Sequence, residues 1–267
     1  MALSEKNYQR VRSWCKERTG VELGEKRQTM VNARLIKRCC ALAINTLDDY
    51  IESLAKSYPD NPEWDHFIHL VTTHETYFNR EAKHFAFIRE KIFPNLDHQN
   101  LKMLSAACST GEEAYSLALE ASEFLGTENT WEVHGFDISP QVIKFARSAI
   151  YPETRLQDLP KSYLKPYFLK GLDENSGYAL VKDKLKKRVQ FYVGNLLHPI
   201  PNAPFDIILC RNTLMYFDWE TKQRVINNLI NALKPNGYLF VSQTEQLTGL
   251  IEESWRIGPS LIKKSHT

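Results

Sequence analysis

The spacing of apolar residues changes near residue 100 and divides the chain into two parts. In the first part, apolar side chains recur at helical intervals, as Tyr8, Val11, Trp14 and Cys15 do, and this spacing predicts amphipathic helices. From Leu101 onward, short apolar runs alternate with helical patterns. Alternating strands and helices are typical of an α/β domain built on a mainly parallel sheet.

Capping residues and prolines place the helices of the first part. We expect one helix over Lys26 to Cys40, and Thr46 should cap the next, from Leu47 to Lys56, which has acids in its first turn. Prolines then interrupt the pattern before a further helix from Trp64 to about Thr72. We therefore predict a small all-helical domain and linker over residues 1–90.

The second part predicts a doubly wound, Rossmann-like domain over residues 91–267. Five apolar runs are predicted as strands: Leu101 to Ala106, Glu132 to Phe136, Val189 to Val193, Phe205 to Cys210 and Tyr238 to Ser242. Ser139 and Asp218 should cap two of the intervening helices. We expect a turn over Lys234 to Gly237, and apolar stretches near Trp255 and Leu261 can complete the sheet edge.

A long insertion, from Tyr151 to Lys187, precedes the third strand. Within it we expect a small antiparallel β-subdomain over about residues 160–190. Its strands would be Tyr178 to Val181 and the run at Val189, paired around Gly171 to Gly177. Such insertions commonly contact a macromolecular partner, and a plain surface flap fits the sequence equally well.

The stretch from Lys102 to Tyr115 predicts a strand, a turn of small residues and a helix, which is how an α/β sheet opens a ligand site. The turn from Cys108 to Gly111 carries little bulk, and glycine adopts backbone angles that other residues rarely do. Glu112 and Glu113 begin the helix, where acids suit the helix dipole but repel a phosphate. A cationic cofactor without phosphate, such as S-adenosylmethionine, fits this turn; a plain structural turn is the alternative.

Ligands of such sheets bind at the carboxyl ends of the strands, so the residues there are informative. Asp137 ends the second strand, where a carboxylate can accept hydrogen bonds from both hydroxyls of a ribose. Asn195 and Asn212 follow the third and fourth strands. Their amides can read adenine and ribose edges, because an amide both donates and accepts hydrogen bonds.

Composition narrows the class of protein. Of 267 residues, 43% are hydrophobic and 25% are charged, and the net charge is +2, so nothing global favours nucleic acid or a membrane as partner. No apolar run approaches the ~20 residues that span a bilayer, and the N-terminus has no signal-peptide core. Five cysteines without a CxxC pair indicate neither disulfides nor zinc. We expect a cytoplasmic protein with reduced thiols.

Three histidines, His66, His69 and His74, invite comparison with a metal site. The carboxylate or cysteine ligands that would complete such a site are not at a recognisable spacing. We therefore expect isolated histidines on a helix surface and no bound metal.

Arg27, Arg34 and Arg38 share one face of the predicted basic helix. This basic face is either solvated surface or a docking face for an acidic helical partner or a nucleic-acid backbone. The sequence alone does not separate these interpretations.

Five motifs then occur in one order along the chain: Thr72-Thr-His-Glu-Thr-Tyr-Phe-Asn-Arg-Glu81, Ser105-Ala-Ala-Cys-Ser-Thr-Gly-Glu-Glu113, Phe136-Asp-Ile138, Gly194-Asn-Leu196 and Cys210-Arg-Asn-Thr-Leu-Met-Tyr-Phe-Asp218. Together they resemble the CheR family, the S-adenosylmethionine-dependent methyltransferases of bacterial chemoreceptors. The resemblance covers essentially the whole chain, including Arg34-Leu-x-x-Arg38 in the helical domain. Any one motif is weak, whereas five in the right order are specific.

The resemblance implies conversion of receptor glutamates to methyl esters in chemotaxis adaptation, with S-adenosylhomocysteine as the product of the cofactor. The implied partner is the cytoplasmic domain of methyl-accepting chemotaxis receptors, with their C-terminal tails in some members. It implies no nucleic acid, no membrane insertion and a monomer. Cofactor contacts are expected at His74, Thr76, Arg80, Glu113, Asp137, Asn195, Leu196, Asn212 and Thr213.

Four positions depart from the family pattern. His74 stands where asparagine is usual, Asn79 where phenylalanine is common, Ala114 where proline is common, and Thr213 where valine is common. The Thr213 contact is expected through the backbone, which a threonine preserves. None of these changes removes a charged group.

Arg80 and Tyr216 are the expected catalytic residues. Arg80 can orient either the substrate carboxylate or the carboxylate of the cofactor. Tyr216 can offer one neutral hydrogen bond near the transfer site, or it is a core aromatic at the start of a helix. Glu113 is the expected cofactor contact, whereas Glu112 should serve the helix start. The basic face gains a role in docking on acidic receptor segments.

Two other functions remain open on the sequence. One is a non-catalytic module with a methyltransferase fold, which the joint retention of Arg80, Glu113 and Asp137 disfavours. The other is a nucleic-acid methyltransferase that uses the basic helix. The near-neutral charge and the lack of an (Asn/Asp)-Pro-Pro-(Tyr/Phe) motif for base flipping disfavour it.

Overall fold

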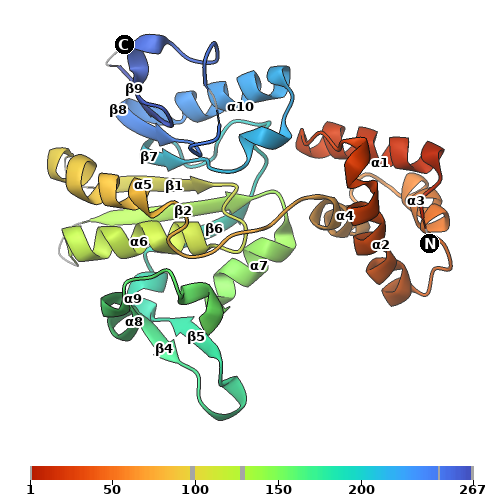
Figure 1. The fold of residues 1–267 in the computed structure, drawn as a ribbon, viewed down its shortest axis with the longest axis horizontal. Coiled ribbons are helices and arrows are strands. Elements are labelled where there is room, and N and C mark those ends of the chain that lie inside the picture. The colour runs from red at the N-terminus through yellow and green to blue at the C-terminus, as the bar shows by residue number, and fades with distance from the viewer. Residues whose placement is uncertain (1, 97–99, 127–129, 246, 266–267) are drawn as a thin grey trace.

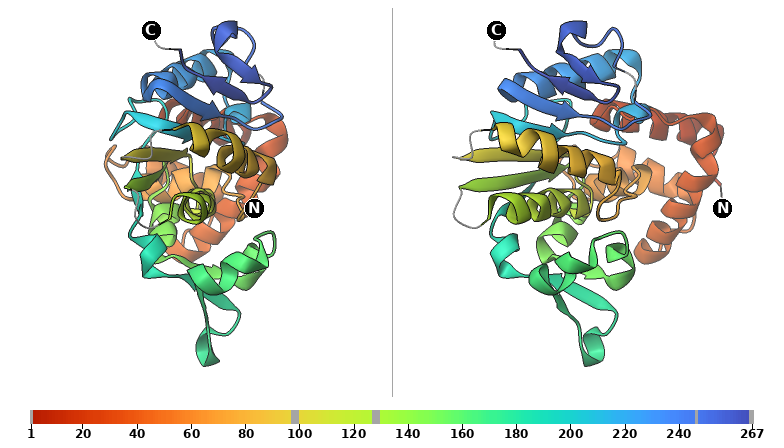
Figure 2. Two further views of the ribbon diagram at one scale, coloured as in Figure 1. Left: turned by 90° about the vertical axis from the view of Figure 1, so that its left-hand side faces the viewer. Right: turned by 60° about the vertical axis from the view of Figure 1, so that its left-hand side comes forward.

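A helical domain lies beyond one end of the strands of a sheet, and helices cover both faces of that sheet (Figure 1). The computed structural model describes residues 2–96, 100–126, 130–245 and 247–265. The turned views show the helical domain at one end of the α/β domain, near the ends of several strands (Figure 2). Within the described residues, no helix combines the length and the apolar character that crossing a membrane requires.

The helical domain contains four α-helices and one short 3₁₀ helix: α1 (Glu5–Thr19), η1 (Glu25–Arg27), α2 (Gln28–Leu42), α3 (Leu47–Ala55) and α4 (Glu63–Val71). Thr46 caps α3 as predicted, because its side chain accepts a hydrogen bond from Asp49 N. The buried faces of the helices form one apolar cluster, in which Trp14, Trp64 and Phe67 meet edge to face. The expected helices of this domain are confirmed within one to two residues at most of their ends.

Two arginines of the predicted basic face make contacts within the molecule. Arg34 Nη1 donates to the carbonyl oxygens of Leu70 and Thr72, at 3.1 and 2.5 Å, and so holds the C-terminal end of α4. Arg38 forms a two-pronged pair with Glu63, at 2.9 and 2.5 Å. Both arginines therefore have partners within the molecule, and docking of an acidic partner on this face stays a prediction.

The main sheet has seven strands in the order β6-β2-β1-β7-β8-β10-β9. The first five run parallel to their neighbours, and the last two are antiparallel. The strands are β1 (Leu101–Ala106), β2 (Trp131–Asp137), β6 (Val189–Val193), β7 (Phe205–Leu209), β8 (Leu233–Phe240), β9 (Arg256–Gly258) and β10 (Leu261–Lys263). The doubly wound prediction is confirmed. The turn predicted over residues 234–237 is wrong, since β8 runs through it with a register shift against β7.

Two apolar clusters cover the two faces of this sheet. Against one face pack α5 (Ala82–Phe87), η2 (Ile88–Ile92), η3 (Phe93–Asn95), α6 (Glu112–Leu125) and α7 (Pro140–Ser148). Against the other face packs α10 (Trp219–Asn231). Phe78, Phe85 and Phe93 lie in the first cluster, so the chain that follows α4 already contributes to the α/β core.

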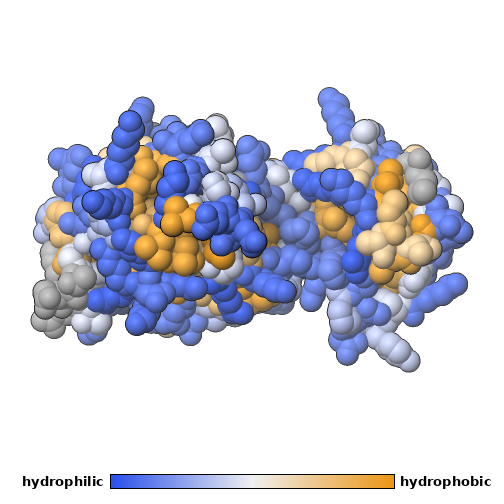
Figure 3. Space-filling model, turned by 90° about the horizontal axis from the view of Figure 1, so that it is seen from below, coloured by the Kyte–Doolittle hydropathy of each residue, from blue (hydrophilic) through white to orange (hydrophobic). Residues whose placement is uncertain are grey.

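The insertion carries a second sheet of three antiparallel strands in the order β3-β5-β4. These are β3 (Ile150–Pro152), β4 (Phe168–Lys170) and β5 (Tyr178–Val181), accompanied by η4 (Glu153–Leu156), α8 (Lys161–Tyr167), η5 (Asp173–Asn175) and α9 (Asp183–Lys186). The small β-subdomain is confirmed, but the strand at Val189 joins β2 in the main sheet and not β5. Figure 3 looks onto this side of the molecule and shows hydrophobic residues gathered there among hydrophilic ones.

Candidate functional site

A pocket opens between the helical domain and the carboxyl ends of the parallel strands, the place that doubly wound sheets use for ligands. The pocket contains about 960 Å³ of empty space, which includes space open to solvent. The helical domain contributes Thr19, Val21 and Arg27 to its wall. The structure brings all ten predicted site residues to this wall: His74, Thr76, Arg80, Glu113, Asp137, Asn195, Leu196, Asn212, Thr213 and Tyr216.

The end of α1 fixes one side of the pocket. Val21 forms a β-bridge with Phe217, and Glu22 N donates to the carbonyl oxygen of Tyr216 at 2.8 Å. Asn195 Nδ2 donates to the carbonyl oxygen of Arg18 at 2.8 Å. These contacts hold the helical domain against the loops that follow β6 and β7.

The turn after β1 requires its glycine, as the sequence predicted. Gly111 has φ of 95°, a backbone conformation that side chains other than glycine rarely adopt. A Cβ atom there would lie 2.8 Å from Ala146 Cβ and 3.0 Å from Phe191 Cζ. The close approach at this glycine is therefore made by side chains of α7 and β6.

Asp137 is buried at the end of β2, and both its oxygens accept backbone hydrogen bonds. Ser109 N donates to Oδ2 at 2.9 Å, and Ser139 N donates to Oδ1 at 3.0 Å. Burial raises the pKa of this carboxyl, while the backbone N–H groups act in the opposite direction. Each carboxylate oxygen keeps a further lone pair with which to accept a ligand hydroxyl.

Glu113 is held in a polar network that the sequence did not reveal. Its Oε1 accepts from Ser105 Oγ at 2.7 Å, and its Oε2 lies 2.7 Å from Arg211 Nε. Arg211 Nη1 donates to the carbonyl oxygen of Arg80, also at 2.7 Å. Arg211 lies in the Cys210-to-Asp218 motif, and a charged residue directly after a buried strand was the signal that could have found it.

Glu112 begins α6, as predicted, and its side chain also binds residues outside this helix. Its side chain is fully buried, forms an ion pair with Arg155 of η4, and accepts from Thr110 Oγ1 at 2.7 Å. Burial raises the pKa of this carboxyl, and the hydrogen bonds from Thr110 and Arg155 oppose the shift. The glutamate therefore fastens the insertion to the turn before α6.

Arg80 presents a guanidinium group that lacks an acidic partner in the described part of the chain. Its Nη1 donates to the carbonyl oxygen of Glu75 at 2.9 Å, and its guanidinium carbon lies 5.7 Å from the centre of the Tyr77 ring. A guanidinium in this state can bind a carboxylate from a ligand, because the charge is not already neutralised.

The amides of Asn195 and Asn212 are largely engaged within the protein. Asn195 Oδ1 accepts from Leu197 N at 3.0 Å, in addition to the bond that its Nδ2 makes to α1. Asn212 Nδ2 donates to Glu81 Oε1 at 3.1 Å and to Ser242 Oγ at 2.9 Å. Both asparagines line the pocket, so reading of a ligand through these amides stays a prediction.

His69 and His74 are not isolated surface histidines, which corrects the prediction. Their rings stack with centroids 4.6 Å apart and an angle of 14° between the planes. His74 Nε2 lies 2.8 Å from Thr72 Oγ1 and 3.1 Å from the carbonyl oxygen of His69. Burial lowers the pKa of His74 and lowers that of His69 to about 4.

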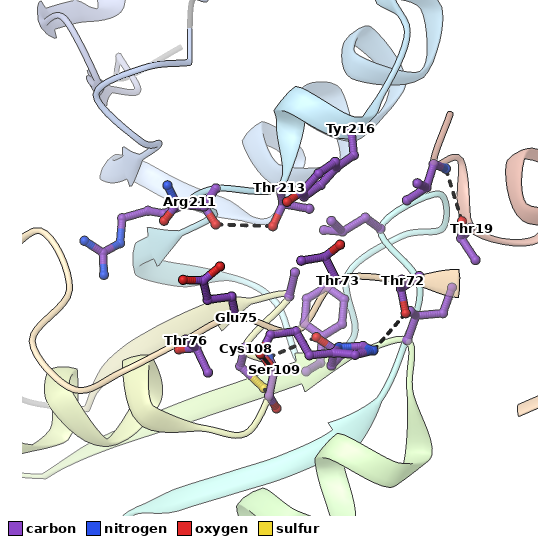
Figure 4. Close-up of a pocket in the computed structure, with 18 of the residues that line it drawn as sticks. Thr19, Thr72, Thr73, Glu75, Thr76, Cys108, Ser109, Arg211, Thr213 and Tyr216 are labelled. Carbon is purple, nitrogen blue, oxygen red and sulfur yellow. Dashed lines mark hydrogen bonds between the residues drawn. The ribbon is translucent and has the colours of Figure 1, made fainter. Parts of the chain in front are cut away.

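Tyr216 lies across the cavity from Glu75 and Thr76, while the side chain of Arg211 points away from it (Figure 4). The guanidinium carbon of Arg27 lies 4.7 Å from the centre of the Tyr216 ring. Thr213 Oγ1 donates to the carbonyl oxygen of Arg211 at 3.2 Å. The phenol therefore belongs to the pocket wall, with an arginine of the helical domain against its ring.

Comparison with known proteins gives two family matches that together cover most of the chain. Residues 74–257 match a family model described as the CheR methyltransferase, SAM binding domain. Residues 6–72 match one described as the CheR methyltransferase, all-alpha domain.

Curated relatives agree over nearly the whole length. A chemotaxis protein methyltransferase of Salmonella typhimurium is 35% identical over 256 residues, which is 95% of this chain and 88% of that protein. One of Escherichia coli is 35% identical over 254 residues, covering 94% and 87%. One of Borreliella burgdorferi is 34% identical over 242 residues, covering 86% and 84%.

Solved structures found by their fold are more distant. The glycopeptide N-methyltransferase MtfA complexed with S-adenosylmethionine is 15% identical, with a TM-score of 0.38 over 63% of this chain and 51% of that chain.

Proposed function

The chain belongs to the CheR family of S-adenosylmethionine-dependent methyltransferases, and we propose that it methylates glutamate side chains of bacterial chemotaxis receptors. The observation that carries the proposal is the convergence of all ten predicted residues on one pocket at the carboxyl edge of the sheet. The proposed partner is the cytoplasmic domain of a methyl-accepting receptor, on which the protein acts as a monomer in the cytoplasm. The receptor's C-terminal tail is a further proposed contact.

The residues in the pocket fit the cofactor. The guanidinium of Arg80, with no described acid beside it, would hold the cofactor's carboxylate. Asp137 would accept hydrogen bonds from the ribose through its remaining lone pairs. Glu113 would face the cationic end of the cofactor, held in place by Ser105 and Arg211. We expect His74, Thr76, Asn195, Leu196, Asn212 and Thr213 to complete the contacts.

When bound, S-adenosylmethionine supplies a methyl group on a positively charged sulfur. A glutamate carboxylate has an unperturbed pKa near ~4.3, so it is ionised at neutral pH and attacks without a general base. The protein's part is then to align the carboxylate with the methyl group and to exclude water. A pocket lined by residues of both domains supports the alignment.

Charge disappears along this reaction, because an anion meets a cation. A tight ion pair between an arginine and the substrate carboxylate would stabilise the ground state more than the transition state. We therefore assign Arg80 to the cofactor's carboxylate. Tyr216, a neutral donor that lies across the cavity from Glu75 and Thr76, would contact the substrate carboxylate.

The test is transfer of a labelled methyl group from S-adenosylmethionine to receptor-containing membranes. We expect wild-type protein to label the receptor, and alkali to release the label as methanol, which distinguishes an ester from an N-methyl group. Arg80→Ala should lower kcat/KM by about 100-fold or more, since a charge-assisted contact is lost. Arg224→Ala, an exposed arginine on α10, is the matched control and should match wild type. Alkali-stable label, or full activity of Arg80→Ala, would contradict the proposal.

A further inference from the structure

A closed ring of contacts links Asp137 to the segment that carries His74. Ser109 joins the two directly, because its N–H donates to Asp137 Oδ2 at 2.9 Å and its hydroxyl donates to the carbonyl oxygen of His74 at 3.1 Å. Ser139 starts the other half, because its N–H donates to Asp137 Oδ1 at 3.0 Å and its Oγ lies 3.0 Å from His69 Nδ1. The stacked rings of His69 and His74 close the circuit.

The protonation of the two rings is set by their partners. The carbonyl oxygen of His69 can only accept, so His74 Nε2, 3.1 Å away, carries a hydrogen. Burial, the neighbouring His74 ring and Arg34 keep His69 neutral at physiological pH, with Asp137 acting in the opposite direction and His66 adding to the shift. Two neutral imidazoles stack without charge repulsion, so the contact between His69 and His74 is compatible with physiological pH.

The circuit crosses from one domain to the other. His69 belongs to α4 of the helical domain, whereas Asp137 ends β2 and Ser139 occupies the N-cap position of α7 without a capping bond from its side chain. Arg34 holds the same stretch from behind, through the carbonyl oxygen of Thr72. The position of His74 relative to Asp137 is therefore fixed through a side chain of the helical domain.

We propose that His69 is a positioning residue for the cofactor: held by Ser139 and stacked on His74, it sets the distance between the two walls on which His74 and Asp137 lie. The inference rests on the proposed cofactor site. On this proposal the helical domain contributes to cofactor affinity, because the imidazole of His69 on α4 connects Ser139 to His74. His69 does not line the pocket and so acts only through its neighbours.

A neighbour on the same helix provides the matched control. His66 also faces α7, where its Nδ1 lies 3.4 Å from Gln141 Nε2. Gln141 Oε1 accepts from Ser139 Oγ at 3.1 Å, so His66 reaches the circuit only indirectly and contacts none of its members itself. Loss of His66 removes a contact between the domains and leaves Asp137, Ser109 and His74 connected. A role in general domain packing would affect both histidines alike.

Calorimetric titration of the full chain with S-adenosylmethionine and with S-adenosylhomocysteine tests the proposal. We expect His69→Ala to weaken both affinities by about tenfold, a change of about 1.4 kcal/mol, while His66→Ala stays within about twofold of wild type. His69→Asn retains a hydrogen-bonding side chain for Ser139 and should recover part of the loss. In methyl transfer, His69→Ala should raise KM for the cofactor and leave kcat near wild type at saturation.

The outcomes separate this inference from the cofactor site itself. Wild-type affinity in His69→Ala overturns the positioning role. The positioning role is also overturned if His69→Ala and His66→Ala lose cofactor affinity equally and in proportion to their lowered melting temperatures. Such a result would indicate that both histidines act through domain packing alone. Asp137→Ala is titrated in parallel, and wild-type affinity in that variant would overturn the cofactor site and the inference together.

Discussion

Arg211 and Glu113 form an ion pair in the wall of the pocket, with 2.7 Å between Nε and Oε2 and with 1% and 13% of the two side chains exposed. The pair joins separate parts of the site, because Glu113 also accepts from Ser105 of β1 and Arg211 also donates to the carbonyl oxygen of Arg80. The segment that presents the Arg80 guanidinium is thus anchored through a charge on another loop.

Loss of one member of this pair should cost more than loss of both. We expect Arg211→Met to lower the free energy of unfolding by about 3–5 kcal/mol, because Glu113 is left as a largely buried charge without its partner. The double variant Arg211→Met/Glu113→Gln should recover part of this loss. Urea denaturation of the single and double variants measures the coupling. Strictly additive losses would show that the two side chains do not depend on each other.

Gly111 provides a test of backbone strain at the turn before α6. Gly111→Ala should destabilise the protein by about 2 kcal/mol or more, because φ of 95° is unfavourable for alanine and the new Cβ would lie 2.8 Å from Ala146 Cβ. Gly126→Ala shares the positive φ but has no atom within 4 Å of its Cβ, and Gly24→Ala has neither feature. The denaturant midpoint should be highest for Gly24→Ala, lower for Gly126→Ala and lowest for Gly111→Ala. An equal loss of stability in Gly126→Ala and Gly111→Ala would show that the close contact with Ala146 Cβ does not contribute to the effect.

Local patterns were sufficient for much of the fold and for the location of the site. The bounds of β1 agree with those predicted from a mostly apolar run, and Asp137 lies at the pocket because parallel strands end at a common edge. The engagement of Arg34 was beyond such patterns. A helical face can be read from spacing, but the carbonyl oxygens that occupy this arginine come from residues 36 and 38 positions further along the chain.

The missed features share that long-range character. The stacking of His69 on His74 depends on how the chain leaves α4, and the burial of Glu112 depends on Arg155 in the insertion. The expected pairing of the strand at Val189 with Tyr178 to Val181 was wrong, because the apolar pattern of a strand does not specify its partner. Spacing identifies elements and strand ends, whereas the partner of a buried charge is settled by tertiary contacts.

His84 predicts a loss of stability in mild acid. Burial first, and Arg211 second, lower the pKa of its ring to about 4, with Glu81 opposing the shift. Between about pH 6.5 and pH 4 the unfolded chain binds a proton that the folded protein does not, so stability falls as the pH falls through this window. The contribution is at most about 3 kcal/mol.

Urea denaturation at pH 7 and pH 5 measures this effect. His84→Gln keeps a side chain that can bond to Ser260 Oγ, which lies 3.0 Å from His84 Nε2. The variant should show a smaller loss between the two pH values than wild type. The remaining pH dependence should include His69, whose pKa is lowered in the same direction. The same pH dependence in both proteins would contradict the assignment to His84.

The phenol of Tyr216 should act on the chemical step, whereas its ring should act on the shape of the pocket. Tyr216→Phe removes one neutral hydrogen bond and keeps the ring against which Arg27 lies, so we expect kcat to fall about 5- to 10-fold with cofactor affinity unchanged.

Tyr216→Ala removes the ring as well, and the pocket wall between the domains then loses its contact with Arg27. This variant should lower kcat further and raise KM for the receptor, because the substrate carboxylate is no longer confined. Single-turnover methyl transfer at saturating cofactor separates the two effects. If Tyr216→Phe has the kcat of wild type while Tyr216→Ala is impaired, the hydroxyl has no part in the reaction and the ring alone shapes the site.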